Sequence, residues 1–414
     1  MPEDLLIINI SGLLQVNQQP VKGLHMKSTP SIENAWLYIK EGKIDSYGKM
    51  PIEKATQNLK NVIDASGCFV LPAWCDSHSH IVYAGSREGE FRDRLHGMTY
   101  EEIASRGGGI LNSAKLLRET AEDDLVQSAM ARLDVVMKQG TGAIEIKSGY
   151  GLDVRSELKM LRVIRKLKTL SPLTIKSTFL GAHAFPPEFK NDKKKYISLI
   201  VEEMLPQIAE EKLADFCDVF CEDGYFTRDE TIYILESALN YGLKPKVHAN
   251  QLNKSGGIQA GVAVNAISVD HLEYTGPEEI ALLQQSNTIA TLLPGAQFFL
   301  QLPAPPARTM IDAGLQVAVA SDYNPGSSPS GNMHLMMALC SILYKMTPEE
   351  SLNAITINGA AAMQVENELG SISAGKKANI LITKPIPSLA FLPYSFGSNL
   401  VKTVIINGMV MSSH

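Results

Sequence analysis

The stretch Phe69–Ile81, FVLPAWCDSHSHI, places two histidines one residue apart at the end of a β-prone run. A β-branched and aromatic segment leads through Leu71–Pro72 into His78 and His80. Residues two apart on a strand point to the same face, so both imidazoles can converge on one point. Histidine is the commonest metal ligand, and the pair suggests half of a metal site. A surface pair would show the same spacing, so the rest of the chain has to supply the other ligands.

The composition indicates a globular protein without a nucleic-acid partner. The 414 residues are 45% hydrophobic and 20% charged, and the formal net charge is -6. An acidic balance without a basic tract argues against nucleic-acid binding. The N-terminal MPEDLLIINI lacks the basic segment of a targeting signal, and the apolar run Thr288–Gln301 is too short to span a bilayer. Five scattered cysteines suit a reducing compartment, so we expect a cytoplasmic protein with no membrane partner.

Both ends of the chain have the pattern of short strands. Residues 5–63 alternate β-rich runs with polar turns, and the C-terminal segment ends in a strand-like run around the hairpin signal Asn407–Gly408. The middle of the chain has a different pattern. We therefore expect a small composite β-sandwich from residues 1–68 and 368–414, with residues 69–367 inserted between them as one larger domain.

Residues 69–367 alternate short apolar runs with helical patterns such as Val154–Leu170. Eight runs are candidate strands: Phe69–Asp76, Thr141–Lys147, Thr174–Gly181, Asp215–Cys221, Pro245–His248, Ala266–His271, Thr288–Leu293 and Gln316–Ser321. Eight β/α units favour an α/β fold of the (β/α)8 TIM barrel type over an open doubly wound sheet, and no GxGxxG follows the first strand. The connection Ile81–Gly140 is longer than one crossover helix, as functional barrel loops often are.

Polar residues gather at the predicted carboxyl ends of these strands, where the active sites of barrel enzymes lie. Five of the nine histidines fall there, namely His78, His80, His183, His248 and His271, and the eighth strand ends at Asp322. His78, His80, His248 and Asp322 together give three imidazoles and one carboxylate. This donor set suits Zn²⁺ or iron, and such a metal activates a bound water near neutral pH.

Longer motifs carry a family resemblance. The HSH pair, the histidines after the fifth and sixth strands and the aspartate after the eighth resemble the amidohydrolase superfamily of metal-dependent hydrolases. The strings AGSREGEFRDRLHGMTYEEIASRGGGI, IEIKSGYGL, FLGAHAFPPE, DHLEYT and SDYNPGSSP resemble one branch of it, the imidazolonepropionase family. The motifs are spread from about Leu71 to Asn358, and the flanking β segments also fit the family.

The resemblance implies hydrolysis of the ring amide of 4-imidazolone-5-propanoate to N-formimidoyl-L-glutamate, a step of histidine degradation. It suggests a homodimer with Zn²⁺ or Fe³⁺ bound by His78, His80, His248 and Asp322, and the lack of a lysine at the end of the fourth predicted strand favours one metal per chain. Catalytic roles go to His271, which would stabilise the oxyanion, to Asp322 as ligand and proton shuttle, and to Gln251. Either Gln251 or Asp322 could position the water. The implied substrate contacts are Arg87, Tyr100, Tyr150, His183, Gln251, Asn324, Gly326 and Ser327, and the guanidinium fork of Arg87 suits the propionate.

Two departures from related enzymes bear on the alternatives. Gln251 stands where deaminases of this scaffold carry the Glu of an HxxE motif, and a neutral amide cannot shuttle protons. Lys147 is the one candidate for the carboxylated lysine that bridges two metals in binuclear relatives, but it ends the second strand, not the fourth. The alternatives are a dihydropyrimidinase-like cyclic amidase, an aromatic deaminase, or a binding protein without catalysis. The filled metal positions argue against the last of these.

Overall fold

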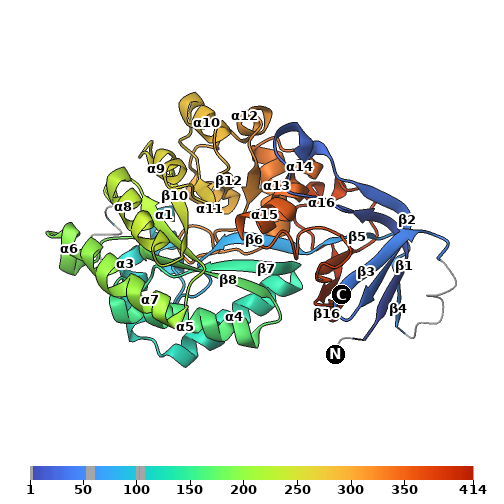
Figure 1. The fold of residues 1–414 in the computed structure, drawn as a ribbon, viewed down its shortest axis with the longest axis horizontal. Coiled ribbons are helices and arrows are strands. Elements are labelled where there is room, and N and C mark those ends of the chain that lie inside the picture. Colours follow the sequence, from blue (N-terminus) through green and yellow to red (C-terminus); the bar gives the residue numbers. More distant parts are fainter. Residues whose placement is uncertain (1–2, 53–60, 99–101, 103–107, 414) are drawn as a thin grey trace.

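The computed structural model describes residues 3–52, 61–98, 102 and 108–413. Two eight-stranded sheets organise the chain. Figure 1 shows one of them surrounded by helices, and the other at the opposite end of the molecule, where both chain termini lie. Within the described residues, no helix combines the length and the apolar character needed to cross a bilayer.

The terminal sheet takes strands from both ends of the chain. In spatial order it contains β16 (Met409–Ser413), β15 (Val401–Ile406), β14 (Ile380–Thr383), β5 (Phe69–Pro72), β1 (Leu5–Leu14), β2 (Ser31–Lys40) and β3 (Lys43–Lys49), and β4 (Val62–Asp64) also pairs with β1. Asn407 and Gly408 connect β15 to β16 at φ of 50° and 77°, the backbone that a two-residue hairpin loop needs. The separate β region built from both termini is thus confirmed.

The second sheet is the predicted barrel of parallel strands. Its order follows the sequence: β6 (Trp74–Ser79), β7 (Thr141–Lys147), β8 (Thr174–Ala182), β9 (Phe216–Cys221), β10 (Lys244–Ala249), β11 (Ser268–His271), β12 (Ile289–Leu292) and β13 (Val317–Val319). These strands are almost wholly buried, because helices cover the outside and side chains fill the inside. The (β/α)8 prediction is confirmed.

Helices connect and cover the barrel strands (Figure 1). They are α1 (Glu88–Leu95), α3 (Ile110–Glu119), α4 (Glu122–Lys138), α5 (Val154–Leu170), α6 (Lys193–Ser198), α7 (Leu205–Glu211), α8 (Arg228–Leu239), α9 (Gly257–Ala263), α10 (Pro277–Gln284), α11 (Pro294–Leu300), α12 (Ala307–Asp312), α13 (Met333–Leu343), α14 (Pro348–Ile355) and α15 (Ile357–Ala362), with α16 (Phe391–Tyr394) near the C-terminus. Shorter helical turns are η1 (Gly23–Lys27), η3 (Pro187–Phe189) and the π-helical η4 (Leu199–Met204).

The predicted strand Phe69–Asp76 divides in two at Ala73. Its first half, β5, pairs with β1 and β14 of the terminal sheet, whereas β6 starts at Trp74 and pairs with β7 of the barrel. Pro72 and Ala73, both poor strand formers, lie at the division, and the change of pairing partner shows that the two halves belong to different sheets. The domain limits of 1–68 with 368–414, and 69–367, stay a prediction.

The barrel closes between its first and last strands, at the predicted metal ligands. Asp322 N donates to His78 O at 2.9 Å, and His80 N donates to Tyr323 O at 2.9 Å. Below them, Asp76 accepts hydrogen bonds from the backbone N (2.9 Å) and Oγ (2.6 Å) of Ser321. Segments more than 240 residues apart in the chain are thereby joined into one seam.

Candidate active site

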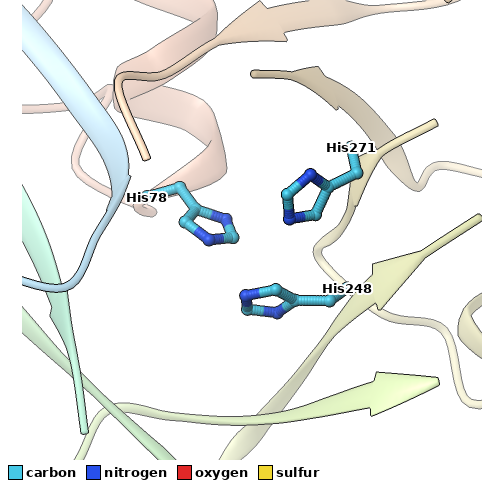
Figure 2. Close-up of side chains that lie close together, drawn as sticks. All are labelled: His78, His248 and His271. Atoms are coloured by element: carbon cyan, nitrogen blue, oxygen red, sulfur yellow. The ribbon is translucent and has the colours of Figure 1, made fainter. Parts of the chain in front are cut away.

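The carboxyl ends of the barrel strands bring four histidines and one aspartate together. Figure 2 shows the imidazoles of His78, His248 and His271, from β6, β10 and β11, pointing toward one another. His78 Nε2 lies 3.3 Å from His80 Nε2 and 3.5 Å from Asp322 Oδ1. His80 Nε2 lies 3.4 Å from the same aspartate oxygen. All five side chains are buried.

The chemistry of this cluster fits a metal ion. The potential ligand atoms of His78, His80 and Asp322 lie within 4.8 Å of one another, and so do those of His78, His248 and His271. The Nε2 atom of His248 is buried without a hydrogen-bond partner among the described residues. Burial, reinforced by neighbouring histidines and by Lys147, lowers the pKa of His78 and of His80 well below the usual value. Neutral imidazoles offer lone pairs, so nitrogen and oxygen donors suited to zinc or iron face one point.

Two carboxylates behind the cluster orient its imidazoles. His78 Nδ1 lies 2.6 Å from Asp270 Oδ2, and His248 Nδ1 lies 3.0 Å from Asp218 Oδ2. An Nδ1–H that faces a carboxylate leaves the Nε2 lone pair free for a metal. Sequence reasoning missed both aspartates. The available signal was a charged residue inside an apolar strand, in CDVFC and in SVDH.

A cavity of about 500 Å³ opens at the cluster. It is lined by every predicted site residue that the structure describes except the fully buried His78: His80, Arg87, Tyr150, His183, His248, Gln251, His271, Asp322, Asn324, Gly326 and Ser327. Tyr100 falls outside the described residues. Lining residues that the sequence did not single out are Glu90, Arg94, Ile110, Phe220, Tyr225, Leu252, Leu300 and Leu302.

Tyr150 and His183 form a wall with fixed proton positions. His183 stacks on His80, with ring centroids 5.3 Å apart and 16° between the ring planes, and its Nδ1 lies 3.0 Å from Gly149 O. Burial lowers the pKa of His183 to about 3, so the ring is neutral and its Nε2 is an acceptor. Burial raises the pKa of Tyr150, so its phenol keeps its proton and can donate.

The buried carboxylate of Glu157, on α5, fixes the loop that carries Tyr150. Its Oε1 accepts from Gly151 N at 2.7 Å and from Leu152 N at 3.0 Å, and its Oε2 accepts from Gly149 N at 3.1 Å. A Cβ on Gly151 would meet the Glu157 backbone, so only glycine allows this close approach. The SGYG motif is thus explained by packing of the loop against α5.

The predicted propionate anchor Arg87 already has a partner. Its Nε and one terminal nitrogen donate to Glu90 Oε2 at 2.9 and 2.5 Å. Glu90 Oε1 in turn accepts from Gly109 N at 2.9 Å. The other terminal nitrogen of Arg87 faces the position where a side chain on Gly326 would lie. Arg94 adds a second cation to the cavity wall, with its guanidinium 4.9 Å from the centre of the Phe299 ring.

The loop after β13 presents the two oxygens of Asp322 to different neighbours. Asn324 Oδ1 accepts from the backbone N of Gly326 and of Ser327, both at 2.8 Å, while its Nδ2 donates to Asp322 O at 2.6 Å. Asp322 Oδ1 faces the imidazoles, and Oδ2 lies 3.4 Å from Ser327 Oγ. Burial raises the pKa of Asp322, which favours a carboxylate that can take up a proton.

His271 lies on the same wall in a strained backbone conformation. Its φ is 89°, unusual for a residue with a side chain and common at functional sites. Its Nδ1 lies 3.8 Å from Glu273 Oε1, an electrostatic contact longer than a hydrogen bond. Burial alone would lower the pKa of His271, but the charges of Glu273, Asp322 and Asp270 outweigh it and raise the pKa. This imidazole is therefore suited to carry positive charge at the cavity.

Lys147 is an ammonium ion inside the barrel. Its Nζ lies 2.6 Å from Glu145 Oε1 and 2.7 Å from Asp218 Oδ2. Burial opposes its charge, but the carboxylates of Asp218, Glu145 and Asp270 prevail and raise its pKa. Carboxylation needs a neutral amine, so these pairs argue against a bridging carboxylated lysine.

Comparison with known proteins identifies the family. The amidohydrolase family matches residues 222–411. Imidazolonepropionase of Flavobacterium johnsoniae is 56% identical over 98% of this chain and 99% of its own length. This chain belongs to the imidazolonepropionase family. Imidazolonepropionase of Thermoanaerobacter pseudethanolicus, at 43% identity over 98% of this chain and 97% of its own, is a more distant relative.

Solved structures share the fold of this imidazolonepropionase family member. An adenosine deaminase from Xanthomonas campestris with bound zinc aligns at a TM-score of 0.71 and 14% identity, covering 99% of this chain and 93% of that one. The E. coli guanine deaminase aligns at a TM-score of 0.76 and 12% identity over the whole of both chains. At such identities the likeness concerns the fold alone.

Proposed function

We propose that this chain hydrolyses the ring amide of 4-imidazolone-5-propanoate to N-formimidoyl-L-glutamate, with a metal ion held by His78, His80, His248 and Asp322. Family membership supports the reaction and the substrate. The observation that carries the proposal is a ligand cluster in a cavity that also contains Arg87. When bound, the ion supplies a Lewis acid that activates water and polarises the ring carbonyl.

Side chains of the cavity account for the protons of the reaction. Water adds to the ring carbonyl carbon, the bond from that carbon to the ring nitrogen breaks, and the carbonyl becomes the new carboxylate. Asp322, with Oδ2 turned away from the imidazoles toward Ser327, takes a proton from the water and returns it to the leaving nitrogen. His271, whose pKa is raised, stabilises the negative oxygen that develops at the carbonyl. Gln251 lines the same cavity and orients the water or the ring through its amide.

The remaining lining residues hold the substrate. Tyr150 donates through its phenol and His183 accepts through Nε2, so together they can orient the ring. Arg87 binds the propionate, and the backbone of Gly326 and Ser327 flanks it. One ion per chain, Zn²⁺ or Fe³⁺, and a homodimer in the cytoplasm complete the proposal.

Turnover with defined metal content tests the proposal. Purified protein is stripped with a chelator, reloaded with Zn²⁺ or iron, and mixed with 4-imidazolone-5-propanoate while the ultraviolet absorbance of the ring is followed. We expect loss of the ring absorbance and formation of N-formimidoyl-L-glutamate only in the loaded protein. Guanine and cytosine serve as controls and should not be deaminated. A folded, metal-loaded protein that leaves the imidazolone intact would refute the proposal.

A further inference from the structure

Charged side chains occupy the barrel interior behind the ligand cluster. Glu145 and Lys147 on β7, Asp218 on β9, Lys246 on β10 and Asp270 on β11 are all fully buried. None of them lines the cavity or takes part in the proposed proton transfers. Buried charges are costly unless they are paired in good geometry, so this set calls for a functional explanation.

Lys147 lies at the centre of these charges. Its Nζ is 2.6 Å from Glu145 Oε1, 2.7 Å from Asp218 Oδ2 and 3.9 Å from Asp270 Oδ2. The two aspartate oxygens that face Lys147 are the same atoms that face the metal-ligand imidazoles. Asp218 Oδ2 is 3.0 Å from His248 Nδ1, and Asp270 Oδ2 is 2.6 Å from His78 Nδ1. One ammonium group therefore connects both ligand-orienting carboxylates.

We propose that Lys147 is a positioning residue for the metal ligands. It holds Asp218 and Asp270 in place, so that Asp218 fixes Nδ1 of His248 and Asp270 fixes Nδ1 of His78. The inference rests on the metal site of the proposed function and extends that site to a residue outside the cavity. Without a cation between them, two buried carboxylates repel each other and turn apart. An imidazole that loses its Nδ1 partner rotates or changes tautomer, and its Nε2 no longer points at the metal.

Lys246 provides a matched control within the same interior. It is also a fully buried lysine, paired with Glu145 Oε2 and donating to Ser77 O at 3.1 Å. In the described part of the chain, it forms no ion pair with Asp218 or Asp270, unlike Lys147. Replacing either lysine by methionine removes one buried cation, but only Lys147→Met removes the link between the ligand-orienting carboxylates.

Zinc affinity separates the two lysines. The Lys147→Met and Lys246→Met proteins are stripped of metal, and the Kd for Zn²⁺ is measured by competition with a chromophoric chelator. Urea unfolding of the metal-free proteins runs in parallel to report stability. We expect Lys147→Met to weaken Zn²⁺ binding about 10- to 100-fold, as losses of ligand-orienting partners do. Lys246→Met should lower stability to a similar extent while its Zn²⁺ affinity stays within about threefold of the wild type.

Each outcome decides the proposal. Wild-type Zn²⁺ affinity in Lys147→Met overturns it, and so does an equal loss in Lys246→Met, which would show a general effect of interior charge. Where Lys147→Met does not fold, the pair Lys147→Met/Glu145→Gln removes one charge of each sign. This double variant should show the same loss, and wild-type affinity in it would also overturn the inference. Failure of the proposed function looks different, because the wild-type protein would then bind no Zn²⁺, or would bind it and leave 4-imidazolone-5-propanoate intact.

Discussion

Replacing Arg87 by alanine tests how the cavity holds the propionate of its substrate. Two of the guanidinium nitrogens donate to Glu90 Oε2 at 2.9 and 2.5 Å, and the third lies close beside Gly326. Both side chains of the pair are 15% exposed, so water screens them only in part. The arginine can therefore offer the substrate the terminal nitrogen that does not contact Glu90, or its whole fork after Glu90 turns away.

The expected magnitude follows from the bonds that are lost. A hydrogen bond to a charged group contributes about 1.5–3 kcal/mol, and about 1.4 kcal/mol corresponds to a factor of ten. Arg87→Ala should therefore raise KM about 10- to 150-fold, with little change in kcat, because the propionate is remote from the bond that breaks. The variant also leaves the Glu90 carboxylate without its arginine. Because this carboxylate then repels the propionate, we expect a rise in KM near the upper end of that range.

Initial rates on 4-imidazolone-5-propanoate measure the effect, and Glu90→Gln is the control. Glu90→Gln keeps the size of the side chain but removes its charge, so we expect an unchanged or lower KM. The double variant Arg87→Ala/Glu90→Gln separates the lost anchor from the unpaired carboxylate. An Arg87→Ala protein with wild-type KM would remove this arginine from the substrate site. A large fall in kcat at constant KM would instead place it at the reacting centre.

Other changes test separate parts of the site. Asp322→Ala should lower kcat by about 10²–10⁴-fold or more, since it removes a ligand together with the proton carrier, and near-normal turnover would contradict this double role. Glu157→Gln should cost about 1–3 kcal/mol of unfolding free energy, because the N–H of Gly149 then faces an amide donor, and should raise KM through Tyr150; urea unfolding and initial rates check both. Burial raises the pKa of Glu157, so its contribution to stability is complete below the unfolded pKa and falls as pH rises through the folded pKa. Urea unfolding from about pH 4 upward should therefore show a decline that Glu157→Gln lacks. Chelation should abolish turnover and lower the melting temperature, and added Zn²⁺ should restore both; a metal-free protein with full activity would refute the metal site.

The sequence predicted best those features that depend on local pattern. The strand Thr141–Lys147 and the helix Val154–Leu170 have the predicted limits, because an apolar run and a 3.6-residue periodicity are visible in single segments. His78 and His80 stood out by their spacing, and the barrel rule then directed attention to the other strand ends.

Features that depend on tertiary pairing could not be predicted from local sequence pattern. Asp218 and Asp270 lie within apolar strands, and whether such a residue faces a ligand depends on the register of the barrel. Glu90 and Arg94 lie on α1, inside the long connection after β6, where no periodicity indicated which residues face the cavity. Pro72 gave a local signal for the division at Ala73, but the change of pairing partner that assigns the two halves to different sheets is a tertiary feature.

Because the seam joins the first and last barrel strands, this site can form only late in the synthesis and folding of the chain. His78 and His80 are joined to Asp322 and Tyr323 across the seam, and the segments that meet there are separated by some 240 residues of sequence. At ordinary rates of synthesis the ribosome needs roughly 10 to 50 seconds to make that interval. His78 and His80 therefore leave the ribosome long before Asp322 is synthesised. A metal ion that needs all the predicted ligands would therefore bind only after the last barrel strand has been made and the seam has closed.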